Sequence, residues 1–298
     1  MIGKILVPLD GSGMSEQALT VAKGLAQAAG AELILLHVLE AHPPATIHGE
    51  KHLATSGEAT AYLEEHARGL LPSGKVTTHV HELSVNDVAE SLASHADELA
   101  PDLVVMCAHG EHNLRDIFVG SMAQQIVTHG FRPVLVMRAS SCAPRFPFRR
   151  ILIPLDGKPE HEKGIPLATY VASKLGSAVT FATVVPTRGE LSGSQAASAA
   201  VLPSATRAML QIAEDEAVER LARITGNARS SGLQANALVV RGNPLEGIVR
   251  IAAETNADLI ALTTHGRHGA EAFWEGSFAP RLYEKLKEQA FLFIPVQG

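Results

Sequence analysis

The sequence predicts an α/β protein of two tandem domains, each a doubly wound five-stranded parallel sheet with helices on both faces. Short β-branched runs alternate with amphipathic stretches of helical period, and this alternation occurs twice in 298 residues. Aromatic residues make up only 4% of the chain, so aliphatic side chains must fill the core. Strands joined by helical crossovers pair in parallel and are covered on both faces, which gives this fold class.

The same motifs appear in both halves of the chain, in the same order. Residues 4–11 read KILVPLDG and residues 150–157 read RILIPLDG, with six of eight positions identical. Further on, PDLVVMCAHGEHNLRDIFVGS (101–121) aligns with ADLIALTTHGRHGAEAFWEGS (257–277). Such a repeat indicates a duplicated domain. We expect the domains at residues 1–140 and 149–298, separated by the linker ASSCAPRFPFRR (139–150).

Each half contains the same series of elements, read from its apolar periodicity. The expected strands are residues 5–7, 33–38, 76–83, 103–106 and 134–137, and then 151–153, 179–185, 235–240, 259–262 and 291–294. The expected helices include 18–29, 56–70 and one starting at Ser121, and then 167–175, 205–224 and one starting at Ser277. Gly30 and Gly176 follow the first helix of each half, where a residue of left-handed conformation ends a helix.

The residues that follow the first and fourth strands are the candidates for a ligand site, because open α/β sheets bind ligands at the carboxyl ends of their strands. The first strand of each half leads into Pro-Leu-Asp-Gly, and the fourth is followed by His-Gly, nine residues and Gly-Ser. A Gly-Ser pair at a helix start offers backbone N–H groups and a hydroxyl to a phosphate. Alternatively, the serines are only helix caps and the glycines only turn formers. The equal spacing in both halves favours a site.

These motifs resemble those of the universal stress proteins, here in tandem. The resemblance rests on the I-L-[VI]-P-L-D-G of strand one, the D-L-[VI]-x-[ML]-x-x-H-G of strand four and the following G-x9-G-S. It implies a fold related to the adenine-nucleotide α-hydrolases, with ribose at the strand-one Asp, adenine at the strand-two backbone and phosphates at the last Gly-Ser. The nucleotide-binding residues that it implies are Pro154, Asp156, Val184, Gly266, Gly269, Gly276 and Ser277, and in the first half Pro8, Asp10, Val38, Gly110, Gly120 and Ser121.

Both halves depart from the ATP-binding pattern of that family. Its first loop glycine is replaced by Cys107 in one half and by Thr263 in the other, and a side chain there narrows the space beside an adenosine. The second half has Arg267 after its loop glycine, where the first half has Glu111. Because a cation favours a phosphate and a carboxylate repels one, we expect ATP, with Mg²⁺, chiefly in the second half.

Fourteen histidines, eleven of them in the first half, do not form a metal-binding pattern in the sequence. We therefore predict no metal ligand, although His79 and His81 point the same way on one strand. His109 and His265 are expected to make structural hydrogen bonds. Cys107 is expected to be a buried, unreactive thiol.

Three functions compete for this sequence. The first is a nucleotide-binding stress or signalling module, the second a protein that acts through protein–protein contacts, and the third a slow ATPase. No paired carboxylates and no nucleophile with a base accompany the Gly-Ser motif, so we expect no catalytic residues. The net charge of −6 argues against nucleic acid and anionic membranes as partners. The lack of a membrane span or leader pattern, with only two cysteines, predicts a cytoplasmic protein.

The final strands and one insertion are the last features that the sequence predicts. The final strands, 134–137 and 291–294, are expected to pair, either within one chain or between two copies in a dimer. Asp10 and Asp156 are 146 residues apart, but Ser121 and Ser277 are 156 apart. The difference is a ten-residue insertion, which we place in the Gly/Ser/Ala-rich stretch 189–205. We expect this stretch to be a mobile loop that covers the second site.

Overall fold

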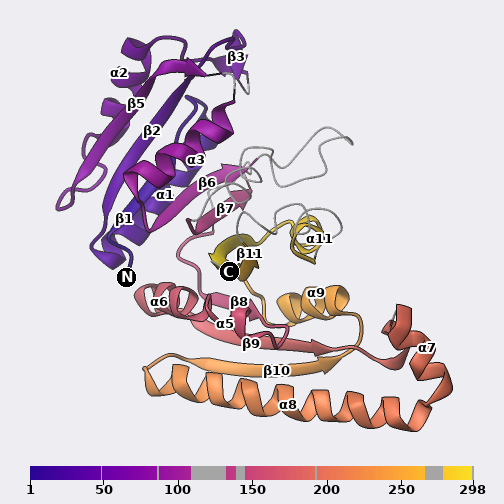
Figure 1. Ribbon diagram of the computed structural model, residues 1–298. Helices are drawn as coiled ribbons and strands as arrows, with labels where there is room; N and C mark the ends of the chain where they lie inside the picture. The colour runs from indigo at the N-terminus through magenta and orange to yellow at the C-terminus, as the bar shows by residue number, and fades with distance from the viewer. Residues whose placement is uncertain are drawn as a thin grey trace.

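The computed structural model of the chain describes residues 1–47, 49–85, 87–108, 132–138, 145–191, 193–265 and 278–296 (Figure 1). The first half contains β1 (Lys4–Pro8), α1 (Gly13–Ala29), β2 (Glu32–Glu40), β3 (Thr46–Ile47), β4 (Glu50–Lys51), α2 (Ser56–Ala67), β5 (Val76–Val85), α3 (Val88–Leu99), β6 (Leu103–Ala108) and β7 (Val134–Arg138). The second half contains β8 (Arg150–Pro154), α5 (Pro159–Glu162), α6 (Ile165–Leu175), β9 (Ala178–Val185), η1 (Arg188–Glu190), α7 (Gly193–Val201), α8 (Pro203–Ser230), β10 (Ala235–Arg241), α9 (Pro244–Glu254), β11 (Leu259–His265), α11 (Phe278–Lys285) and β12 (Ala290–Val296).

The main sheet has ten strands in the order β10-β9-β8-β11-β12-β7-β6-β1-β2-β5. All neighbours within a half are parallel, as predicted. The two halves meet where β12 pairs antiparallel with β7, with Leu292 opposite Leu135. The final strands therefore pair within one chain, and the predicted fold class is confirmed in each half.

Helices cover both faces of this sheet and enclose two apolar layers. On one face α1, α2, α6 and α8 bury residues such as Leu25, Leu63 and Leu221. On the other face α3, α9 and α11 bury residues such as Leu92 and Ile248. Figure 1 shows α8 along β9 and β10, with α9 on the opposite side of the sheet. The odd and even residues of each strand supply the two layers, as the alternation of side chains in a strand requires.

The predicted helix ends are confirmed where a glycine is required. Gly30 and Gly176 take φ values of 72° and 63°, and each lies directly after the last residue of α1 or α6. A residue with a Cβ is strained in this conformation, which explains why glycine ends both helices.

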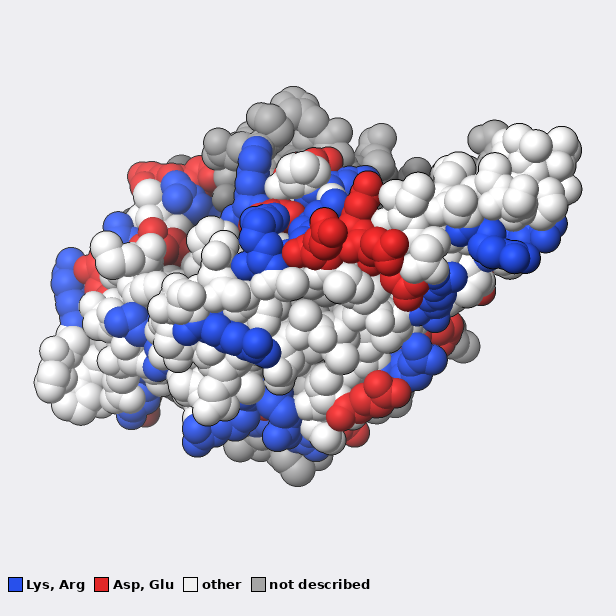
Figure 2. All heavy atoms as spheres, turned by 90° about the horizontal axis from the view of Figure 1, so that it is seen from below, with Lys and Arg blue, Asp and Glu red and all other residues white. Residues whose placement is uncertain are grey.

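The inserted stretch is helical, so our expectation of an irregular loop is wrong in its secondary structure. It forms η1, α7 and the beginning of α8, which starts at Pro203 and runs for 28 residues. Small residues such as alanine favour a helix, and Pro203 occupies the first turn, where its missing N–H costs nothing. This end of the molecule projects at the right of Figure 2, where an uncharged tip is bordered by Lys and Arg side chains. The exposed apolar side chains there are Val201, Leu202, Met209 and Ile212. That the segment covers the second site stays a prediction.

The linker does more than separate the two halves. The Phe148 side chain is 2% exposed and belongs to the layer that α1 and α6 cover. The Phe146 ring lies edge-on to it, with ring centroids 5.6 Å apart, and packs against Gly24 of α1. The hydroxyl of Ser177 donates a hydrogen bond of 2.7 Å to the Phe148 carbonyl. The end of the linker is therefore part of the core. Among the described residues, none of the helices combines the length and hydrophobicity of a membrane span.

Candidate functional site

In each half, the predicted residues that the structure describes lie at or near the carboxyl ends of the first two strands. Pro8 and Pro154 end β1 and β8, and the next residue in each half bonds to the neighbouring strand. The N–H of Leu9 donates to the Leu36 carbonyl and that of Leu155 to the Ala182 carbonyl, both at 2.8 Å. Seven predicted residues lie outside the described part of the chain: Gly110, Gly120, Ser121, Gly266, Gly269, Gly276 and Ser277.

Asp10 forms part of the start of α1. Its Oδ1 accepts hydrogen bonds from the Ser12 N–H at 2.9 Å and from the Ser12 hydroxyl at 2.6 Å. The hydroxyl of Ser12 in turn caps α1 by accepting from the Ser15 N–H. Gly11 between them has a φ of 90°, which explains why glycine follows the aspartate. Asp10 is the residue of the first half that was predicted to bind ribose. Its Oδ1 therefore has a structural role.

Asp156 accepts the equivalent backbone hydrogen bond but has different side-chain partners. Its Oδ1 accepts from the Lys158 N–H at 3.1 Å and lies 2.8 Å from Nδ1 of His161, on α5. The Lys158 ammonium is 3.8 Å from the other oxygen. Burial alone would raise the pKa of Asp156, but the hydrogen bonds from His161 and Lys158 hold this pKa below its usual value. Asp156 is therefore a stabilised carboxylate between the Lys158 ammonium and the His161 ring.

The two Asp-Gly turns have opposite surroundings. The guanidinium of Arg220, from α8, lies against Gly157, so close that a Cβ on Gly157 would be 2.3 Å from its Nη1. In the first half a Cβ on Gly11 would instead be 2.8 Å from Cγ of Leu53. The carboxylate of Glu50 accepts a hydrogen bond of 2.7 Å from the nearby Gly13 N–H. The second turn is thus lined by a cation and the first by an apolar and an acidic side chain.

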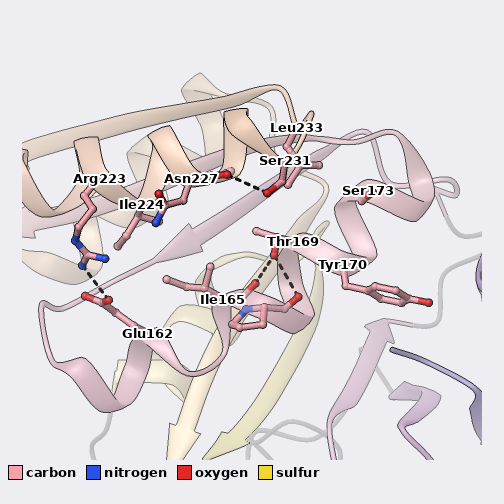
Figure 3. Close-up of a pocket in the computed structure, with 12 residues that line it drawn as sticks. Glu162, Ile165, Thr169, Tyr170, Ser173, Arg223, Ile224, Asn227, Ser231 and Leu233 are labelled. Carbon is pink, nitrogen blue, oxygen red and sulfur yellow. Dashed lines mark hydrogen bonds and ion pairs between the residues drawn. The ribbon is translucent and has the colours of Figure 1, made fainter.

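Arg220 is held in place by a small ion-pair network. Its Nε lies 3.7 Å from Oε1 of Glu162, and Nη2 of Arg223 lies 3.2 Å from Oε2 of the same carboxylate. Figure 3 shows the pair of Arg223 and Glu162 bridging α8 and α5. It borders a groove of about 540 Å³ between α6 and α8. Of the predicted site residues that the structure describes, none lines this groove.

Cys107 and Thr263, which replace the first glycine of the ATP-binding pattern, have different environments. The Thr263 hydroxyl donates a hydrogen bond of 2.7 Å to the His161 carbonyl. A Cβ on Gly164 would be 2.2 Å from this hydroxyl, so the turn between α5 and α6 packs directly on Thr263. Burial, followed by the charge of Asp10, raises the pKa of the Cys107 thiol to about 12. Cys107 therefore stays protonated at neutral pH, which supports its interpretation as an unreactive thiol.

Sequence reasoning missed Arg220, His161, Glu50 and Leu53. His161 follows Asp156 by only five residues, so the sequence could have indicated it as a partner of this carboxylate across the loop after β8. Arg220 and Glu50 gave no signal, because their positions depend on how a long helix and a hairpin cross the strand ends.

The histidines of the first half include a cluster between β5 and α3. Nε2 of His95 lies 2.7 Å from Nδ1 of His81, and the ring of His79 is centred 5.1 Å from that of His95. Nδ1 of His95 is 3.4 Å from the Glu98 carboxylate. Within the described residues, His, Cys, Asp and Glu side chains do not form a group of three or more that could hold a metal ion.

Acid is expected to destabilise the first half through His95. Burial, together with His81 and His79, lowers the pKa of His95, while Glu98 acts in the opposite direction. The unfolded chain therefore binds the proton more readily, and the free energy of unfolding falls as the pH drops below about 6.5. We expect the thermal unfolding midpoint of His95→Gln to change less than that of wild type between about pH 7.5 and 5. The exposed His42→Gln is the control, and equal slopes for His95→Gln and wild type would contradict the prediction.

Comparisons with known proteins agree with the duplicated fold. The model of a family described as "Universal stress protein family" matches residues 1–138 and again residues 147–287. A Thermus aquaticus protein named "Universal stress protein in QAH/OAS sulfhydrylase 3'region" is 32% identical over 142 residues, 46% of this chain and 100% of that protein. Universal stress protein YxiE of Bacillus subtilis is 28% identical over 158 residues, again 46% of this chain and 100% of that protein.

A solved structure resembles the whole chain. The crystal structure of a universal stress protein from Archaeoglobus fulgidus covers 98% of both chains with a TM-score of 0.69 at 16% sequence identity. At this identity the likeness shows the fold alone.

Proposed function

Because the chain belongs to the universal stress protein family, we propose that it is a stress-response module whose second half binds ATP or a related adenine nucleotide. The observation that carries the proposal is the contrast between the two Asp-Gly turns. Arg220 and Lys158 lie beside Asp156 and Gly157, whereas Glu50 and Leu53 lie beside Gly11 and Gly13. A phosphate is attracted by the Arg220 and Lys158 cations and repelled by the Glu50 carboxylate. The proposed domain limits remain 1–140 and 149–298, and the proposed location is the cytoplasm.

The described residues of the second half offer partners for the ribose and for the adenine of such a ligand. The Asp156 carboxylate is an acceptor for ribose hydroxyls, and the β9 backbone at Val184 lies at the end expected for adenine. Pro154 ends β8, which leads into Asp156. Gly266, Gly269, Gly276 and Ser277 would hold the phosphates with their Mg²⁺, by resemblance. Pro8, Asp10, Val38, Gly110, Gly120 and Ser121 form the corresponding set of the first half.

The test is a pair of arginine variants on one face of α8. Arg220→Gln removes the cation at Gly157, and the matched control Arg223→Gln removes the second partner of Glu162 without touching Gly157. We expect Arg220→Gln to weaken ATP binding by about tenfold in calorimetry, the loss of one charge-assisted contact, and Arg223→Gln to stay within about twofold of wild type. Equal affinities of the two variants would contradict the role of Arg220.

Nucleotide released from purified, denatured protein separates the proposal from its main alternative, a protein that acts through protein–protein contacts. The exposed apolar side chains at the end of α7 and the beginning of α8 favour that alternative, because exposed apolar surface can mark an interaction site; they are Val201, Leu202, Met209 and Ile212. If the denatured protein releases no adenine nucleotide and ATP gives no heat of binding, this alternative replaces the first. A turnover assay with Mg²⁺ that shows many cycles per minute would instead favour an ATPase.

A further inference from the structure

A short segment of the first half lies over the end of β1 and the start of α1. We call residues 50–53, Glu50 to Leu53, the strap. Glu50 and Lys51 form β4, which pairs antiparallel with β3. At one end of the strap, the Glu50 carboxylate accepts from the N–H of Gly13, the first residue of α1. At the other end, Leu53 packs on Gly11, directly after Asp10.

His52 anchors the strap between these two contacts. It is 3% exposed, its N–H donates to the Ala45 carbonyl at 3.4 Å, and its Nε2 lies 3.3 Å from Glu40 at the end of β2. Its ring approaches the edge of the His37 ring with a centroid distance of 6.5 Å. Nδ1 of His37, which is 2% exposed, lies 2.7 Å from the Leu9 carbonyl. A buried side chain with these partners holds the strap against the strand ends.

The strap places a negative charge where a helix favours an anion. The first N–H groups of a helix have no partner within it, and the helix dipole adds positive potential there. Glu50 supplies the anion from the same chain, and Leu53 places an apolar side chain on the Asp-Gly turn. At the equivalent turn of the second half, the three atoms nearest to a Cβ on Gly157 all belong to Arg220. The two halves therefore differ in what lies on the turn.

We propose that the strap closes the strand-end site of the first half, with Glu50 as a built-in anion, so that the chain binds one adenine nucleotide until the strap opens. This inference rests on the proposed function of the second half. It assigns a regulatory contact to the first half: a ligand there must displace Glu50 from Gly13 and Leu53 from Gly11.

The experiment opens the strap and measures two independent quantities. The variant is Glu50→Ala with Leu53→Ala. The control is Lys51→Ala, which lies in the same hairpin and loses only an exposed ion pair with Glu58. The first measurement is hydrogen exchange at the Gly13 amide without nucleotide, by NMR. We expect it to be at least about fivefold faster in the double variant than in wild type and unchanged in the control, because its acceptor is Glu50.

The second measurement is the stoichiometry of ATP binding with Mg²⁺ by calorimetry. We expect it to rise from one site per chain in wild type to two in the double variant. Unchanged exchange at Gly13, or faster exchange with the stoichiometry still at one, overturns the proposal. If ATP binds to none of the proteins, the proposed function fails and the one-nucleotide claim fails with it, while Gly13 exchange separately decides whether the strap is closed. If the double variant does not fold, Glu50→Ala alone is judged by the same two measurements.

Discussion

Phe291→Ala is expected to lower the free energy of unfolding by about 3–5 kcal/mol, because it leaves a cavity in the seam between the two halves. Phe291 is 0% exposed and lies opposite Val136, the β7 residue that it faces across the antiparallel pairing. Its ring also stacks on Phe293 and meets the edge of Tyr283. Urea unfolding followed by circular dichroism measures the loss.

The control for Phe291 is a phenylalanine of equal burial that lies inside one half. Phe181 in β9 is 0% exposed and pairs only with strands of the second half. We expect a similar loss of stability from Phe181→Ala, but a different distribution in hydrogen exchange. Phe291→Ala should accelerate exchange in β7 as well as β12, whereas Phe181→Ala should leave β7 unchanged. Exchange in β7 that is unaffected by Phe291→Ala would show that the seam does not couple the halves.

The strands could be predicted because a strand that is buried on both faces of a sheet requires a short apolar run, which is visible in the local sequence. Ten short apolar runs ended by Pro, Asp, Gly or polar residues were expected, and each lies within one of the ten strands of the main sheet. The pairing of β7 with β12 stayed open, because an apolar edge strand accepts a second copy as well as its own chain. Only the structure distinguishes these two outcomes.

The candidate site could be predicted only as far as it lies on the strands. Asp10 and Asp156 follow directly from the strand-one motif. Arg220 and Glu50 instead come from connections whose path has no periodicity: Arg220 is 63 residues after Gly157, and Glu50 is 37 residues after Gly13. Their contacts depend on the length of α8 and on a hairpin inserted before α2. The motifs alone favoured the second site, through Arg267 against Glu111, and the connections add Arg220 and Glu50 to that difference.

The contacts of the linker could not be predicted from the sequence either, and they lead to a prediction about α1. Two prolines and little periodicity indicated a separator, yet Phe146 packs so closely on α1 that a Cβ on Gly24 would be 2.0 Å from its Cε1. Alanine normally stabilises a helix interior by about 1 kcal/mol relative to glycine. Here the added methyl must displace an aromatic ring, and we expect Gly24→Ala to lower the free energy of unfolding by about 1–3 kcal/mol. Gly226 in α8 has no atom within 4 Å of its Cβ position, so Gly226→Ala should instead stabilise the protein.

The sign of the Gly24 effect should reverse once the ring is gone. In a Phe146→Ala background nothing opposes the methyl group, and Gly24→Ala is expected to raise the free energy of unfolding by about 0.5–1 kcal/mol. Urea unfolding of wild type, both single variants and the double variant gives the coupling energy directly, because the two residues are in contact. A coupling near zero would mean that Phe146 does not pack on α1 in solution. A coupling of about 2 kcal/mol would instead show that Phe146 of the linker packs on α1 as part of the core.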